Sequence, residues 1–233
     1  MVPDNKKIVP RHIGIILDGN RRWARARDLP TLEGHRRGYQ NIKRIALSAF
    51  KSGVEILTVY AFSTENWRRE KKEVEYLLKL FRLLVDREAD LLMKKGVRIN
   101  FFGRRQDFDK SLQDGMKQIE RRTKGNRKGV LNICLSYGGR DEIVRAVRKL
   151  AAKKAAPRDI TEESISANLD SAAWPDPDLI IRTSGEQRLS GFLTWQSVYS
   201  ELYFTQKHWP EFDSGDLSQA LESYGRRGRR YGK

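Results

Sequence analysis

The residues with the clearest chemical potential lie in the stretch IGIILDGNRR, residues 13–22. Asp18 follows an apolar run directly, and a carboxylate in that position can hold a divalent cation beside a phosphate. Arg21 and Arg22 carry guanidinium groups suited to phosphate oxygens, and Gly19 lets the backbone approach a ligand closely. A helix that begins at this turn would direct free N–H groups toward an anion. Taken alone, the stretch is equally compatible with Asp18 as a simple helix cap.

Two further apolar runs also lead into loops that carry cations and hydroxyl groups. VEILTVYAF (54–62) is followed by STENWRR, and DLIIRT (178–183) is followed by SGEQRLSGF. One such loop is usually a solvated surface, but three loops at one edge of a sheet favour an anion site. Glu201 lies in the apolar stretch SELYF, where a lone charge is costly to bury. It is predicted either to pair with one of these arginines or to serve as a second metal ligand.

Alternating strand-like and helix-like segments must position these residues. The strand-like runs are 13–17, 54–62, 97–103, 130–137, 178–183 and 200–205. Apolar residues recur at helical spacing over 34–53 and 74–92, and further helices are expected near 108–124, 140–155, 161–169 and 214–226. This order predicts a parallel sheet with helices on both faces and functional groups at the carboxyl ends of the strands. We expect one α/β domain over 1–233, with an N-terminal tail at 1–10 and a basic C-terminal tail at 225–233.

The charge and cysteine content limit the possible partners and compartment. The 233 residues include 46 Lys and Arg against 30 Asp and Glu, a net charge of +16. This excess favours phosphate-bearing partners, whether a small substrate, an anionic lipid or nucleic acid. Cys134 is the single cysteine, which excludes a disulfide framework and fits a reducing cytoplasm. No run approaches the ~18 apolar residues that cross a bilayer, so we expect a soluble protein that can touch a membrane surface.

Several common site patterns are absent from the sequence. It has no G-x-x-x-x-G-K-[ST] loop and no G-x-G-x-x-G after a strand, which argues against an NTPase or a dinucleotide enzyme. A phosphatase of the haloacid-dehalogenase type would need a second acid where Asn20 stands. A nucleic-acid-binding protein would explain the basic runs 121–128 and 225–233, but not Asp18 or Glu201. We therefore expect no nucleic-acid partner.

Six motifs in this order resemble the cis-prenyltransferases, in particular undecaprenyl (di-trans,poly-cis) diphosphate synthase. They are HIGIILDGNRRWAR, EGHRRG, YAFSTENWRR, YGGR, IRTSGEQRLSGFLTWQ and ELYFT…WPEF, and they run from about residue 10 to the C-terminus. The resemblance implies a homodimer with a mainly parallel six-stranded sheet flanked by helices. It also implies an enzyme that uses Mg²⁺ to condense isopentenyl diphosphate repeatedly with an allylic diphosphate, farnesyl or geranylgeranyl diphosphate. The product would be a long-chain poly-cis polyprenyl diphosphate, the precursor of a lipid carrier.

The resemblance implies a role for each residue that matches a family motif. Asp18 would hold Mg²⁺ and be essential for catalysis, Glu201 would be a metal ligand, and Asn66 would act where the proton is lost. Asparagine is a poor base, so Asn66 is expected to orient a water or a diphosphate oxygen. The allylic diphosphate site would be lined by Gly19, Asn20, Arg21 and Arg22, with Trp23 and His35 beside them. The loop after the second strand would contact substrate through Ser63, Thr64, Glu65, Trp67 and Arg69.

The remaining implied contacts concern the second substrate and the partner subunit. The diphosphate of isopentenyl diphosphate would be bound by Arg182, Arg188, Leu189 and Ser190, and Arg230 and Gly232 would reach the partner's active site. Thr31 and Gln187 stand where many relatives carry arginine and histidine, which weakens one phosphate contact and a metal role there. The aspartate of the first strand and its neighbouring arginines are present, so autonomous activity is expected rather than a non-catalytic partner subunit.

A hydrocarbon product also needs an apolar site and an exit. The apolar face of 74–92 and the small Ala61 are where a tunnel would run in this family, although such a stripe is more often plain core. The excess basic charge would let the enzyme contact an anionic membrane, at its inner face, and release the product there.

Overall fold

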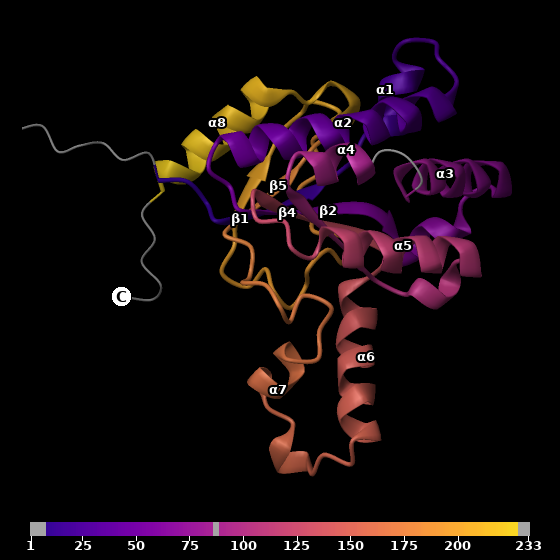
Figure 1. The fold of residues 1–233 in the computed structure, drawn as a ribbon. Coiled ribbons are helices and arrows are strands. Elements are labelled where there is room, and N and C mark those ends of the chain that lie inside the picture. Colours follow the sequence, from indigo (N-terminus) through magenta and orange to yellow (C-terminus); the bar gives the residue numbers. More distant parts are fainter. Residues whose placement is uncertain (1–7, 86–88, 228–233) are drawn as a thin grey trace, which may run out of the picture.

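The computed structural model describes residues 8–85 and 89–227 (Figure 1). Its strands form a six-stranded sheet in the order β3-β4-β2-β1-β5-β6, and every pair of neighbours is parallel. The strands are β1 His12–Ile16, β2 Ile56–Ser63, β3 Val97–Phe102, β4 Gly129–Tyr137, β5 Leu179–Arg182 and β6 Glu201–Phe204. The predicted mainly parallel six-stranded sheet in a single α/β domain is confirmed. The apolar runs form strands because helices cover both faces of the sheet and bury them.

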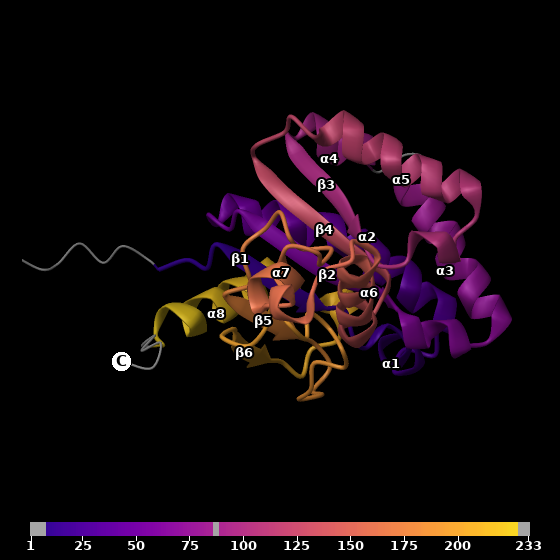
Figure 2. The ribbon, with the colours of Figure 1, turned by 90° about the horizontal axis from the view of Figure 1, so that it is seen from below.

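Helices lie on both faces and at one edge of the sheet. They are α1 Asn20–Arg25, α2 Thr31–Lys51, α3 Lys71–Leu83, α4 Ala89–Lys94, α5 Lys110–Thr123, α6 Gly139–Ala152, α7 Glu162–Ser166 and α8 Ser214–Gly225. α2 and α8 lie side by side on one face, whereas α6 extends away from the opposite face with α7 beside it (Figure 1). α4 and α5 pack against β3 at one edge, and β6 forms the other edge (Figure 2).

The observed helix bounds differ from the predicted ones where a helix begins or ends in polar residues. The helix expected over 74–92 begins at Lys71, because its first turn is charged and gives no apolar signal. It ends at Leu83 and is followed by a π-helical turn at 84–85. The separate helix α4 begins at Ala89. Residues 86–88 lie outside the described part of the chain. The helix expected from residue 34 begins earlier, at Thr31, directly after a proline.

The register of the sheet brings distant segments to one edge. Ile16, the last residue of β1, is level with Tyr60 of β2 and Arg182 of β5. Because the strands are parallel, the residues that follow β1, β2 and β5 emerge together at the carboxyl edge. The three arginine-bearing loops predicted to converge therefore do so.

A chain of polar side chains, buried except for the half-buried Asn100, crosses the sheet. His12 Nδ1 lies 2.7 Å from the carbonyl oxygen of Pro175, and its Nε2 lies 2.8 Å from the Thr58 hydroxyl. The amide of Asn132 donates to Thr58 at 3.1 Å, and the amide of Asn100 donates to Asn132 at 2.9 Å. Burial lowers the pKa of His12 from 6.5 to about 4, so this imidazole is neutral at physiological pH.

No helix within the described ranges is long and apolar enough to cross a membrane.

Candidate active site

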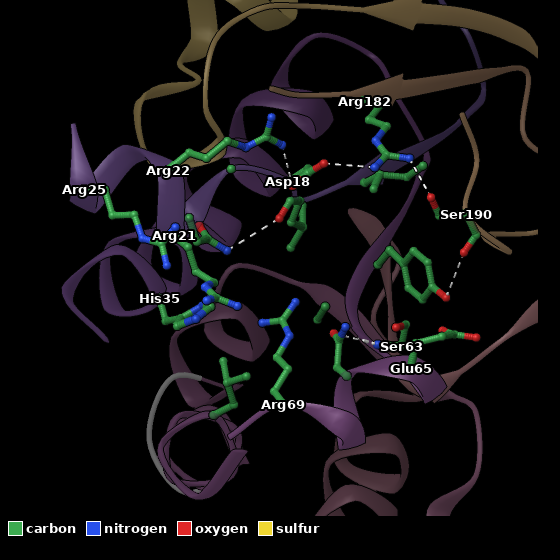
Figure 3. A pocket seen from close by; sticks show the side chains of 18 residues that line it. Asp18, Arg21, Arg22, Arg25, His35, Ser63, Glu65, Arg69, Arg182 and Ser190 are labelled. Carbon is green, nitrogen blue, oxygen red and sulfur yellow. Dashed lines mark hydrogen bonds and ion pairs between the residues drawn. The ribbon is translucent and has the colours of Figure 1, made fainter. Parts of the chain in front are cut away.

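Asp18 occupies the centre of the carboxyl edge, between two arginines (Figure 3). Its Oδ2 accepts a hydrogen bond from Arg182 Nη2 at 2.9 Å, and its Oδ1 lies 3.1 Å from Arg22 Nη2. Burial alone would raise the pKa of Asp18, but the hydrogen bonds and charges of both arginines outweigh it, so the pKa lies below its ordinary value. The carboxylate is therefore ionised at neutral pH and available to a cation.

The turn after Asp18 has no room for a side chain. Gly19 has a φ of +99°, and a Cβ there would lie 2.6 Å from Ser184 Oγ and 2.7 Å from His208 Nδ1. The Thr183 hydroxyl and the backbone N–H of Trp209 both donate to the Asp18 carbonyl, at 2.7 and 2.9 Å. Gly19 is the N-cap residue of α1, and no side chain caps that helix. The interpretation of Asp18 as a helix cap is therefore wrong.

Arg182 links the acid to the loop that follows β5. Its guanidinium is 6% exposed, and it donates through Nη1 to Ser190 Oγ at 2.8 Å and to the carbonyl oxygen of Arg188. Ser190 has a φ of +51°, an unfavourable conformation for a residue other than glycine. This loop is thus held in one arrangement against Arg182 and, through it, against Asp18.

The loop after β2 forms a short 3₁₀ helix, Thr64–Arg68, which places Asn66 at the cavity. The backbone N–H of Ser63 donates to Asn66 Oδ1 at 3.1 Å. The Asn66 NH₂ group can donate to a ligand, and the amide oxygen is too weak a base to take up a proton.

Glu73 organises the opposite wall of the cavity. This carboxylate receives hydrogen bonds from His35 at 2.9 Å and from Arg69 at 2.8 Å, and Arg21 lies 3.7 Å away. Burial alone would raise the pKa of Glu73, but Arg69 and His35 outweigh it and the net pKa lies below its ordinary value. Burial lowers the pKa of His35. Sequence reasoning missed Glu73, although an acid on the buried side of an amphipathic helix is a recognisable signal.

These groups surround a cavity of about 730 Å³. Figure 3 shows Arg25, Arg21 and His35 on one side and Arg182 and Ser190 on the other. The predicted site residues that line it are Asp18, Gly19, Asn20, Arg21, Arg22, His35, Ser63, Glu65, Asn66, Arg69, Arg182 and Ser190. The apolar lining comes from Ile16, Leu17, Tyr60, Ala61 and Leu77, so Ala61 lies where a tunnel was expected. Leu77 belongs to the apolar face of 74–92 where the tunnel was also expected, whereas Arg25 and Tyr60 were not singled out from the sequence.

Two aromatic residues expected to bind substrate lie behind the cavity wall. The Arg27 guanidinium lies over the ring of Trp23, with Cζ 4.7 Å from the ring centroid, and Trp23 does not line the cavity. Trp67 donates through Nε1 to Ser136 Oγ at 2.8 Å and packs against Phe62. Both residues therefore support the loops that carry site residues.

Three other predicted contacts also lie off the cavity lining. The Thr64 hydroxyl donates to Glu65 at 3.0 Å, so it orients that carboxylate. Leu189 packs against a small apolar cluster, and Arg188 pairs with Glu186 at 2.6 Å with 61% of its side chain exposed. Arg188 contacts a cavity residue only through its carbonyl oxygen, which accepts a hydrogen bond from Arg182.

Glu201 lies at the amino end of the strands, whereas Asp18 lies at their carboxyl end, and this corrects the expected position of Glu201. It is the first residue of β6 and is level with Leu179, which is level with Ile13 at the start of β1. β1 ends at Ile16, three residues or about 10 Å beyond Ile13 along the strand direction, and Asp18 follows that end. Glu201 pairs instead with Arg227. One chain therefore cannot place Glu201 and Asp18 on the same cation, because Glu201 begins its strand whereas Asp18 follows one. The predicted contacts of Arg230 and Gly232 lie outside the described residues.

A divalent cation fits this site only together with a phosphate-bearing ligand. Within the described residues, no group of three or more His, Cys, Asp or Glu side chains could enclose a metal. Asp18 presents one ionised carboxylate at the cavity, and Mg²⁺ is commonly held by one or two carboxylates with substrate phosphate oxygens and water. The donor set therefore matches Mg²⁺ bound jointly by Asp18 and a diphosphate.

An acid among arginines at the carboxyl edge of a parallel sheet, beside an apolar wall, defines a class of α/β enzymes that act on amphipathic phosphate esters. The chain belongs to the prenyltransferase family whose model is described as "Putative undecaprenyl diphosphate synthase", which matches residues 16–232. This confirms the family indicated by the six motifs, and with it a prenyltransferase.

Relatives match over nearly the whole chain. The isoprenyl transferase of Aquifex pyrophilus is 46% identical over 225 residues, 97% of this chain and 96% of that protein. A ditrans,polycis-undecaprenyl-diphosphate synthase ((2E,6E)-farnesyl-diphosphate specific) of Xanthomonas axonopodis pv. citri is 47% identical over 236 residues, covering 100% and 92%. Lavandulyl diphosphate synthase from Lavandula x intermedia, solved with dimethylallyl diphosphate, superposes with a TM-score of 0.93 at 36% identity, covering 97% and 99%.

Proposed function

We propose that this chain is a cis-prenyltransferase that condenses isopentenyl diphosphate repeatedly with farnesyl or geranylgeranyl diphosphate. The observation that carries the proposal is the ionised Asp18 between Arg22 and Arg182, in a cavity lined by both polar and apolar side chains. Two diphosphates need two cationic sites, and the arginines flank Asp18 from α1 on one side and from β5 on the other. The product would be a long-chain poly-cis polyprenyl diphosphate.

The allylic diphosphate is placed beside α1, from which Arg21, Arg22 and Arg25 line the cavity, with Arg69 facing them. These cations neutralise the negative charge that develops as the carbon–oxygen bond breaks and the diphosphate departs. Mg²⁺ held by Asp18 would supply further charge neutralisation at the leaving oxygens. Gly19 brings the backbone close to the same group because nothing larger fits the turn.

Isopentenyl diphosphate is placed on the other side, against Arg182 and Ser190. Its double bond attacks the allylic carbon from which the diphosphate departs, and a proton is then lost from the new chain. Asn66 acts by donating its amide N–H to a water or a diphosphate oxygen, because an amide is too weak a base to take the proton itself. The base is then a group that Asn66 orients.

The hydrocarbon of the allylic substrate is placed against the apolar lining, formed by Ile16, Leu17, Ala61 and Leu77. These side chains exclude water from the reacting carbons and offer no polar partner to a competing nucleophile. Ala61 leaves more room at the end of β2 than a larger apolar residue would.

Assembly and location also belong to this proposal. A homodimer would let Arg230 and Gly232 reach the partner's active site, and it would offer Glu201 a second chain on which to act as a metal ligand. The net charge of +16 supports contact between a cytoplasmic enzyme and the anionic inner face of a membrane, where a hydrophobic product is released.

One experiment tests the reaction directly. The purified protein is incubated with farnesyl or geranylgeranyl diphosphate, labelled isopentenyl diphosphate and Mg²⁺, and the labelled products are sized. We expect chain extension that EDTA abolishes, and a loss of about a thousandfold in kcat/KM for Asp18→Ala. Asp159→Ala is the matched control, since this exposed aspartate lies far along the chain in a surface 3₁₀ turn. Absence of extension with either primer would overturn the proposal.

A further inference from the structure

Tyr60 lies where the substrate loops meet, and its ring is held rigidly. Its ring stacks on Phe192, with centroids 5.0 Å apart and an interplanar angle of 18°. The ring of Tyr137 meets it edge-on at 5.9 Å. Aromatic contacts of this kind fix the ring plane, so the hydroxyl is directed to one place at the cavity wall.

The Tyr60 hydroxyl contacts backbone from two segments that are far apart in sequence. It donates to the carbonyl oxygen of Tyr137 at 3.0 Å and lies 3.5 Å from the carbonyl oxygen of Ser190. The Ser63 hydroxyl is a further hydrogen-bond partner of this group. Burial and the nearby charge of Glu65 raise the pKa of Tyr60, so the phenol stays protonated and remains a donor.

The contact with Ser190 matters for two reasons. The backbone of Ser190 is strained, and its side chain is hydrogen-bonded to Arg182 in the site. Its φ of +51° lies in the left-handed region, which a residue other than glycine adopts only when its surroundings impose it. The contacts that hold the segment include the hydrogen bond from the N–H of Gly139 to the Gly191 carbonyl at 2.7 Å and the Tyr60 hydroxyl beside the Ser190 carbonyl. Ser190 Oγ in turn accepts from Arg182.

We propose that Tyr60 is a positioning residue for the isopentenyl diphosphate site, acting through Ser190 on the guanidinium of Arg182. The inference rests on the proposed function, which assigns that substrate to Arg182 and Ser190. Because Arg182 also binds Asp18, the chain of contacts runs from Tyr60 to the centre of the site without Tyr60 touching the diphosphate. Its hydroxyl therefore serves one substrate, while the allylic site on α1 is held by other residues.

The test is Tyr60→Phe, which keeps the stacked ring and removes the hydroxyl. We expect KM for isopentenyl diphosphate to rise about tenfold, which corresponds to about 1.4 kcal/mol. KM for the allylic substrate and kcat should change by less than about twofold, a split that general loosening of the fold would not produce. Tyr203→Phe is the matched control, since Tyr203 lies on β6 outside the cavity lining and should leave all three constants unchanged.

A double-mutant cycle identifies the route of the effect. If Tyr60 acts through Ser190, Tyr60→Phe should add little to KM once Ser190→Ala has removed the bond to Arg182. Additive effects, or an equal rise in both KM values, would overturn the inference while wild-type turnover still supports the proposed function. Failure of the wild-type enzyme to extend any primer would instead refute the proposed function itself.

Discussion

His12 makes the stability of this protein depend on pH in a way that one substitution can isolate. The imidazole is 2% exposed and joins the buried polar chain across the sheet. Its pKa is about 4 in the folded protein against 6.5 for an ordinary histidine. At a pH between these two values, His12 is protonated in the unfolded chain and neutral in the folded chain, so protonation favours unfolding.

The size of the effect follows from the two pKa values. The stabilisation is fully present above pH 6.5 and is lost as the pH falls toward 4. Each unit of difference corresponds to 1.36 kcal/mol, so the complete loss is about 3 kcal/mol. Between about pH 7 and pH 5 the same linkage removes about 2 kcal/mol from the free energy of unfolding.

The assay compares urea unfolding of the wild type and His12→Gln at both pH values. Glutamine can still donate to Pro175 and accept from Thr58, but it does not titrate. Acidic groups such as Asp18 also shift stability with pH, yet they are common to both proteins and cancel in the difference. We expect the wild type to lose about 2 kcal/mol more than the variant between pH 7 and pH 5. Equal losses in the two proteins would show that His12 is not held neutral, and the reasoning would fail.

Two further outcomes test the site and the surface. Gly19→Ala should destabilise the fold by about 1–3 kcal/mol and abolish most activity, because the new Cβ meets Ser184 and His208 in a left-handed turn; thermal unfolding and turnover measure both. Gly125→Ala is its control, since nothing lies within 4 Å of the added carbon. The protein should float with liposomes that contain anionic lipid and less so in high salt. Equal recovery on neutral liposomes would contradict a charge-driven contact.

Much of the site could be predicted because it depends on which residues directly follow the strands. Asp18 and Arg182 follow or end apolar runs, and parallel strands bring such residues to one edge whatever the order of the strands. Glu201 is the second residue of the predicted run 200–205, so a parallel sheet already indicates the amino edge, and the register confirms it. Its expected role as a metal ligand came from the family resemblance, not from its place in the run.

Glu73 and Tyr60 show a second limit. Each lies in a segment whose pattern indicates ordinary core, an amphipathic helix and a buried strand. Their importance comes from partners distant in sequence: His35 for Glu73, and Tyr137 and Ser190 for Tyr60. Local periodicity carries no information about such contacts, since it reports only which face of an element is buried.

The amino-acid sequence by itself determined the family, the alternating α/β order, the parallel sheet and the acid among arginines at its carboxyl edge. These properties follow from apolar periodicity and from short motifs, which are local in the chain. Only the tertiary structure decided that Asp18 binds two arginines instead of capping a helix, and that Glu201 pairs with Arg227. The physical reason is that a carboxylate takes its role from the charges within about 4 Å of it. Arg22 is four residues from Asp18 along the chain, but Arg182 is 164 residues away and reaches Asp18 only through the pairing of the strands.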